Sequence, residues 1–200
     1  PECKVVITIS NALLFLNLGC LSIGIPLPSS AIDTMLFFNR LREIFLALLD
    51  NISSIELSRI LAEITPEGIN HFFYGSSGSE SNDTVVRLVR RYWDILGKKN
   101  KKTFISRTYA YHGSTMAGAS LGGMEPMHSQ GDLPLQGFAH VMPPYHYKFG
   151  KNLNEEEFTV LAVKEIENKI IELDPDNVAA FMGEPIQAAG GVIVPPQNYW

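Results

Sequence analysis

Apolar positions along the chain follow two periods in turn, and this alternation predicts helices that are followed by strands. Residues 79–96 carry apolar side chains at helical spacing, and residues 103–106 then return as a short strand. A second pair follows, with a helix that Asn154 can cap and a continuous apolar run over residues 178–182. Such a run is typical of a parallel strand covered on both faces. The pattern predicts an α/β fold.

The two predicted helices each carry one apolar stripe that is expected to face the core. In the first helix its members are Val85, Leu88, Val89, Tyr92 and Leu96, and in the second Phe158, Leu161, Ile166, Ile170 and Leu173. Gly97 suits the C-terminus of the first helix, and Asp174-Pro175-Asp176 stops the second.

Weaker patterns complete the picture on either side of these units. Helices are expected over residues 36–49 and 55–64, and a short buried strand over residues 69–74. Residues 118–150 are rich in Gly, Pro and aromatic side chains, which predicts a loop region that packs on the rest of the chain or on a second subunit.

Charge and cysteine content exclude several classes of protein. Lys and Arg number 16 against 21 Asp and Glu, and the basic residues form no long patch interleaved with aromatics, which argues against a nucleic-acid partner. The two cysteines, Cys3 and Cys20, have no CxxC spacing, so neither a disulfide framework nor a zinc site is indicated. A reducing, cytoplasmic location fits this content.

The N-terminal part of the chain is the least regular. No charged residue occurs from Val5 to Ile32, a length that would suffice for a membrane span. Asparagines, glycines and two prolines interrupt this run, and they argue against a span. Attachment to a membrane stays open as an alternative. Because the chain starts at Pro1 rather than Met and stops at Trp200 after an apolar run, we expect it to be a piece of a longer protein.

A Gly/Ser turn between a strand and a helix is the first sign of chemistry. Residues 72–84 read FFYGSSGSESNDT, in which Gly78 permits close approach to the backbone and Ser79 can donate a hydrogen bond. The N-terminus of a helix at such a turn favours a phosphate, although a turn of this kind often does no more than cap the helix. The turn has neither the Walker pattern nor G-x-G-x-x-G.

Two further segments carry polar groups to the same predicted sheet edge. Glu184 directly follows the apolar run 178–182, where an unpaired charge is costly and needs a partner. Tyr111 precedes His112-Gly113, and such an aromatic side chain either fills the core or faces a ligand. The histidines at 112, 128, 140 and 146 lack metal-ligand spacing, so we expect hydrogen-bonded loop residues and no metal site.

Five segments, in this order, resemble the class III pyridoxal-phosphate-dependent aminotransferases, and in particular the omega-transaminases. They are SGSESNDT at 77–84, RRYWDILGKKNKKTFISR at 90–107, YHGSTMAGASLGGM at 111–124, GDLPLQGFAH at 131–140 and VAAFMGEPIQAAGGVIVPP at 178–196. The resemblance covers residues 55–200. No functional residue is transferred to residues 1–54, which we treat as a divergent N-terminal segment.

The resemblance implies an incomplete large domain of the three-layer fold type I transferases over residues 55–200, with the N-terminal segment belonging to the small domain or its connection. Pyridoxal 5'-phosphate (PLP) is the implied cofactor. Gly78 and Ser79 would hold its phosphate, Tyr111 would stack on its ring, and Glu184 would lie beside the ring. The implied reaction moves an amino group from an omega-amine, diamine or omega-amino acid to pyruvate or a similar 2-oxo acid, in a homodimer.

The same resemblance implies that this chain supplies no catalytic residue. The Schiff-base lysine of the family and the aspartate that pairs with the pyridine nitrogen lie downstream of the segment corresponding to Trp200. An alternative is therefore a noncatalytic remnant that keeps the phosphate-binding turn and serves as a cofactor-binding or dimerisation module.

Overall fold

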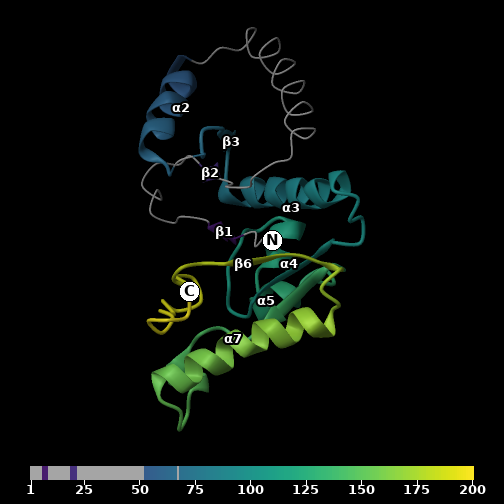
Figure 1. Ribbon diagram of the computed structural model, residues 1–200, viewed down its shortest axis with the longest axis vertical. Coiled ribbons are helices and arrows are strands. Elements are labelled where there is room, and N and C mark those ends of the chain that lie inside the picture. Colours follow the sequence, from purple (N-terminus) through teal and green to yellow (C-terminus); the bar gives the residue numbers. More distant parts are fainter. Residues whose placement is uncertain (1–5, 9–18, 22–51, 67) are drawn as a thin grey trace. The chain divides into compact units, whose positions relative to one another are not determined.

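The computed structural model describes residues 6–8, 19–21, 52–66 and 68–200 (Figure 1). The chain divides into two compact units. The first consists of Pro1–Leu21 and Tyr74–Trp200, and the second of Ser22–Phe73. Every residue expected at the candidate site belongs to the first unit.

A four-stranded sheet forms the centre of the first unit, in the order β1-β6-β4-β5. Its strands are β1 (Val6–Thr8), β6 (Val178–Gly183), β4 (Thr103–Arg107) and β5 (Phe138–Val141). All three pairings are parallel, as the continuous apolar runs predicted. Phe104 and Ile105 in β4 are fully buried, and Met182 in β6 nearly so. Since the strands are parallel, the segments that follow β4 and β6 leave the sheet at one edge.

Helix α3 (Gly78–Ile95) covers the sheet with a face that is wider than the predicted stripe. Val85, Val89 and Tyr92 are buried as expected, and Trp93 joins them and donates its indole N–H to the Ala179 carbonyl oxygen in β6 at 2.8 Å. Two members of the predicted stripe, Leu88 and Leu96, are exposed instead. Leu88 lies at the edge of the buried face, and Leu96 is the residue that caps the helix.

Gly97 lies at the C-terminal end of helix α3, as predicted from the sequence. Gly97 has φ +75°, and its N–H donates to the Asp94 carbonyl oxygen at 3.1 Å, while Lys98 N–H donates to the Trp93 carbonyl oxygen at 2.8 Å. These two bonds form a Schellman motif, which requires a left-handed residue after the cap.

Helix α7 (Glu155–Glu172) lies on the opposite side of the sheet from α3 (Figure 1). Asn154 and Glu157 form the two reciprocal bonds of a capping box. Phe158 and Ala162 are fully buried in a cluster with Tyr199. Leu161, which was expected inside, is exposed because the buried face runs through Thr159 and Ala162 on the other side of Phe158. With α3, the sheet and α7, the unit has the three predicted layers.

The segment predicted as a loop region is more ordered than its composition indicates. Three short helices and the edge strand β5 lie within it, so the prediction of a loop region was wrong for these elements. The helices are α4 (Met116–Leu121), α5 (Glu125–His128) and α6 (His146–Phe149). Each spans one or two turns, too short for helical periodicity to be visible in the sequence.

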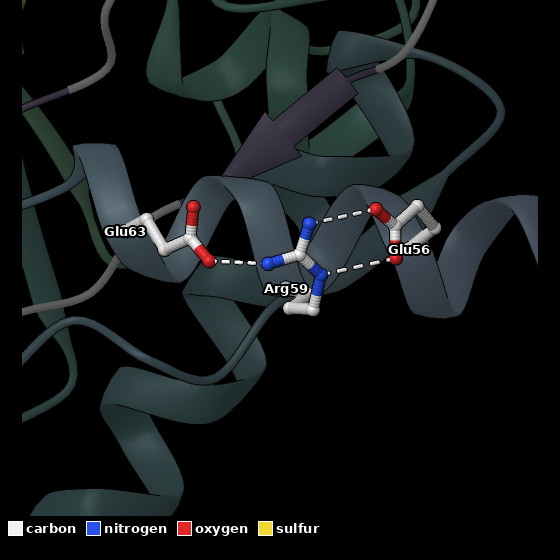
Figure 2. Close-up of polar contacts among 3 residues, drawn as sticks. All are labelled: Glu56, Arg59 and Glu63. Carbon is white, nitrogen blue, oxygen red and sulfur yellow. Dashed lines mark hydrogen bonds and ion pairs between the residues drawn. The ribbon is translucent and has the colours of Figure 1, made fainter.

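Helix α2 (Ile52–Ile64) lies in the second unit and confirms the helix expected over residues 55–64. Its exposed face carries a three-residue ion pair network (Figure 2). The Arg59 guanidinium donates to both Glu56 carboxylate oxygens, at 2.8 and 3.1 Å, and also to Glu63. All three side chains are exposed, so the network contributes little to stability.

Strand β3 (Phe73–Gly75) is shorter than the strand predicted over residues 69–74, and it pairs with β2 (Gly19–Leu21). Phe72 is buried but precedes the strand, and Phe73 is exposed, so the expectation of a fully buried strand was wrong.

Most of the irregular N-terminal region lies outside the described residues. The helix expected over residues 36–49 falls wholly there, as does Cys3, and only β1 and β2 of the charge-free run are described. Among the described residues, no helix combines the length and hydropathy that a membrane span requires.

Candidate functional site

The first turn of α3 presents free donors beside open space. Ser77 caps the helix by accepting a hydrogen bond from Glu80 N–H at 3.2 Å, and the Glu80 carboxylate accepts one from Ser76 N–H at 2.7 Å. Within the described part of the chain, the N–H groups of Gly78 and Ser79 have no hydrogen-bond partner. A Cβ at Gly78 would meet no atom within 4 Å. These features suit an anion at the positive end of the helix.

The segment that follows β4 contacts this first turn through residues 113 and 114. Ser79 Oγ accepts a hydrogen bond from Ser114 N–H at 3.1 Å. Gly113 has φ +125°, and a Cβ there would lie 2.7 Å from Ser79 Oγ and 2.9 Å from Ser79 Cα. Only glycine satisfies both the backbone angle and the space, so this close approach depends on Gly113.

Two further side chains of α3 bind the residues on either side of this contact, His112 and Thr115. The Asn82 amide donates to the His112 carbonyl oxygen at 2.7 Å, and this bond is buried. Thr115 Oγ1 donates to the Asp83 carboxylate at 2.7 Å and also caps α4. The segment is thus fixed to α3 at each residue from 112 to 115.

Glu184 and Tyr111 meet directly at the carboxyl edge of the sheet. Glu184 comes immediately after β6 and is 7% exposed, and its carboxylate accepts a hydrogen bond from Tyr111 N–H at 3.0 Å. The Tyr111 side chain itself is 44% exposed, so its ring can be contacted by a ligand. The carboxylate thereby fixes the backbone that carries this ring.

A second charge lies behind Glu184. Arg107, the last residue of β4, is fully buried, and its Nη2 donates to the Glu184 backbone carbonyl oxygen. Burial raises the pKa of Glu184, while the Tyr111 N–H and the Arg107 charge act in the opposite direction. Burial likewise lowers the pKa of Arg107, and the nearby Tyr199 and Glu184 oppose that shift. Arg107 is thus a nearby positive charge that favours the ionised carboxylate, although the hydrogen bond it forms is to the main chain of Glu184.

His112 is held neutral by its surroundings. The side chain is 4% exposed, and burial, with smaller contributions from the positive charges of Arg107 and His140, lowers its pKa to about 4. Its Nε2 atom is buried without a hydrogen-bond partner.

The other three histidines bind backbone oxygens, as expected, but the expectation that they lie in loops was wrong, because His128 ends α5, His140 lies in β5 and His146 begins α6. His128 contacts the carbonyl oxygens of Ala119 and Gly122, His140 that of Leu121, and His146 that of Leu153. For the Nε2 atom of His112 the expectation was wrong. The described residues contain no group of three or more side chains that could hold a metal ion.

The structure brings the expected residues into one region. Tyr111 and Glu184 touch, and Ser79 joins them through Ser114 and Gly113. Gly78 directly precedes Ser79 and starts the adjoining helix, and a Cβ there would meet no atom within 4 Å.

Sequence reasoning missed Gly113, Asn82 and Arg107. Arg107 carried a readable signal, because a charge at the end of a buried strand needs a partner as much as Glu184 does. Nothing in the local sequence marks Asn82, which lies on a helix among other polar residues.

Comparison with known proteins gives these features a context. Residues 38–200 match the family described as aminotransferase class-III. Over 146 residues the chain is 53% identical to the putrescine--pyruvate aminotransferase of Pseudomonas aeruginosa, which covers 73% of this chain and 32% of that protein. It is 39% identical over 153 residues to the diaminobutyrate--2-oxoglutarate transaminase of Halomonas elongata, covering 75% of this chain and 33% of that protein.

Solved structures give the same result for the fold. The omega transaminase of Pseudomonas jessenii in complex with PMP matches with a TM-score of 0.71 and 49% identity, covering 74% of this chain and 33% of that one. A thermostable (S)-enantioselective omega-transaminase from Thermomicrobium roseum matches with a TM-score of 0.69 and 43% identity, covering 73% and 33%. The chain spans about a third of the length of these relatives.

Proposed function

Because this chain belongs to the class III aminotransferase family, we propose that the protein containing it is a PLP-dependent transaminase. The reaction moves an amino group from an omega-amine, diamine or omega-amino acid to pyruvate or a similar 2-oxo acid. The relatives named for putrescine and for diaminobutyrate support an amine donor with a second amino group.

One observation carries the proposal: three segments far apart in the sequence converge at one edge of the sheet. The Glu184 carboxylate accepts the Tyr111 N–H at 3.0 Å, and Ser79 accepts the Ser114 N–H at 3.1 Å. These bonds join a helix N-terminus, an accessible aromatic ring and a buried carboxylate, which are the groups that the family uses around its cofactor.

The residues fit PLP by their own chemistry. Open space over Gly78 and the free N–H groups of the first turn suit a dianionic phosphate. The accessible Tyr111 ring suits stacking on a pyridine ring, and Glu184 fixes the backbone that presents it. We assign Gly78 and Ser79 to the phosphate, Tyr111 to the ring face, and Glu184 to the support of that ring.

Bound PLP would supply an electron sink when a bond from the substrate carbon to hydrogen breaks. The residues of this chain bind and orient the cofactor, and none of them is assigned to proton transfer at the substrate carbon. The lysine that carries the cofactor is expected from the rest of the protein.

The remaining assignments follow from family membership. We propose that residues 55–200 form part of the PLP-binding large domain and that residues 1–54 belong to the small domain or its connection. We also propose a cytoplasmic homodimer. The exposed apolar side chains Leu135 and Tyr147, in the segment between β4 and α7, are compatible with a subunit contact.

A charge placed at the phosphate site tests the binding role. In the complete protein, Ser79→Asp should weaken PLP binding by about tenfold or more, because a carboxylate repels the phosphate. It should leave the helix stable, since an acidic residue in the first turn is favourable. Ser129→Asp adds the same charge at an exposed serine in α5's C-terminal turn and should bind PLP normally. Equal PLP affinity in Ser79→Asp and the unsubstituted protein would exclude this phosphate site.

Turnover tests the reaction. With pyruvate as acceptor, the complete protein should form alanine from putrescine or a related diamine, and formation should depend on PLP. Binding of PLP without any amine turnover would instead support the noncatalytic module. No PLP binding at all would refute both.

A further inference from the structure

Arg107 is the least accessible charged side chain among the described residues, and it is only partly satisfied. It is 0% exposed, and one guanidinium nitrogen, Nη2, donates to the Glu184 carbonyl oxygen. The other two, Nε and Nη1, are buried without hydrogen-bond partners. Burying a cation with two unpaired donors costs folding free energy, so the presence of Arg107 at this position is not explained by packing alone.

The rings of Tyr199 and Trp200 and the carboxylate of Glu184 stabilise the positive charge of Arg107. The guanidinium carbon lies 5.8 Å from the centre of the Tyr199 ring and 5.2 Å from that of the Trp200 ring. Gly183 makes room for the arrangement, since a Cβ there would lie 2.9 Å from the Trp200 ring and 3.3 Å from Arg107 Nη2. The cation is therefore held against the end of β6, immediately before Glu184.

Arg107 connects to the proposed ring-binding residue in two steps. It binds the main chain of Glu184, and the Glu184 side chain accepts the Tyr111 N–H at 3.0 Å. Arg107 lies in β4, Glu184 follows β6, and Tyr111 lies in the loop after β4, so the two contacts join the ends of adjacent strands.

We propose that Arg107 is a positioning residue of the site: it fixes the main chain of Glu184 in place, and through the Glu184 side chain it fixes the main chain of Tyr111. The inference rests on the proposed function because it names PLP as the ligand whose binding depends on this arrangement. Arg107 itself is not expected to touch the cofactor.

The charge of Arg107 matters because the Glu184 carboxylate is buried. The groups that favour its ionised form are the backbone N–H groups of Tyr111 and Ala188 and the Arg107 cation. Tyr199 and His112 also lie near Arg107, but neither is positively charged near neutral pH, so neither can replace the charge of Arg107 beside Glu184. Without Arg107, burial raises the pKa of Glu184 further, and a protonated Glu184 accepts the Tyr111 N–H less strongly.

The experiment compares Arg107→Met and Arg107→Lys in the complete protein, with PLP affinity measured from pH 6 to pH 9. Arg107→Met should weaken PLP binding most at the acid end, by about tenfold, and the affinity should recover as the pH rises. Arg107→Lys keeps the charge and should largely restore the pH profile. Arg90→Met is the control, because Arg90 also stacks on two rings, the buried Phe104 and the half-buried Phe138, but donates to the Lys102 carbonyl oxygen, far along the chain from Glu184.

A double-mutant cycle with Glu184→Gln tests whether Arg107 acts through Glu184. We expect the effect of Arg107→Met on PLP affinity to shrink to about twofold or less in the Glu184→Gln background. Equal effects in both backgrounds, or a pH profile unchanged by Arg107→Met, would overturn the inference. If Arg107→Met does not fold, Arg107→Gln, which removes the charge but keeps a polar side chain, takes its place in the same cycle, and an effect on PLP affinity that is independent of Glu184 is equally fatal. An unsubstituted protein that fails to bind PLP would refute the proposed function and this inference together.

Discussion

Replacing His112 with glutamine should remove most of the acid sensitivity that this residue gives to the fold. His112 is 4% exposed, and burial lowers its pKa to about 4 from an ordinary value of 6.5. The unfolded chain therefore takes up a proton near pH 6.5, whereas the folded protein does so only near pH 4. Between these values the unfolded state binds more protons, so the free energy of unfolding falls as the pH falls.

The size of the effect follows from the two pKa values. Linkage gives a loss of about 2 kcal/mol between pH 7 and pH 5, and about 3 kcal/mol once the pH is below 4. No reduction for solvent screening is needed, because the imidazole is buried. A glutamine of similar size does not titrate and should lose none of this stability.

Urea unfolding at fixed pH values, without added cofactor, measures the effect in the complete protein. The informative quantity is the difference between the unsubstituted protein and His112→Gln at each pH, because other titrating groups cancel from it. His71→Gln is the matched control, since it makes the same replacement at an exposed histidine.

The reasoning would be refuted by parallel pH profiles for the unsubstituted protein and His112→Gln. It would also fail if His112→Gln became the more acid-sensitive of the two. A lower stability of His112→Gln at neutral pH would show only that the glutamine packs less well, and the difference in slope between the two pH profiles would still decide.

Three further substitutions test the packing around the site and the two layers of helices. Gly113→Ala should destabilise the protein by about 2–4 kcal/mol in urea unfolding, because of the φ of +125° and the clash with the first turn of α3. The control Gly131→Ala, at φ +72° in open space, should cost about 1 kcal/mol. Equal costs for the two variants would contradict the clash. Trp93→Phe should cost about 1–3 kcal/mol by leaving the Ala179 carbonyl oxygen unpaired, and a neutral result in thermal unfolding would argue against that bond. Asn154→Ala should cost about 1 kcal/mol by removing the capping box, measured in the same way, and no change would mean that the cap is replaced.

Local chemistry made several parts of the fold predictable. The Asn154 cap with Glu157 and the Gly97 stop depend on residues three to five positions apart, and both have the expected geometry. The apolar run that became β6 was long enough to be recognised as a covered strand. By contrast, the phase of a helix relative to the sheet is set by packing, and for this reason Leu88 and Leu161 were assigned to the wrong side.

Only part of the candidate site could be recognised from the sequence. Glu184 was recognisable because a carboxylate after a buried strand needs a partner. Its partners, Tyr111 N–H and Arg107, lie 73 and 77 positions away in the chain, and no local pattern connects them.

The sequence by itself determined the alternation of helices and strands, the ends of the long helices and, through its motifs, the family. These properties depend on short-range bonds and on residue types, which can be read along the chain. Only the tertiary structure decided which side chains meet: that Arg107 lies behind Glu184, and that Gly113 rests on Ser79. Contacts of this kind depend on the order of the strands in the sheet, and burial then fixes which charges and hydrogen bonds they require.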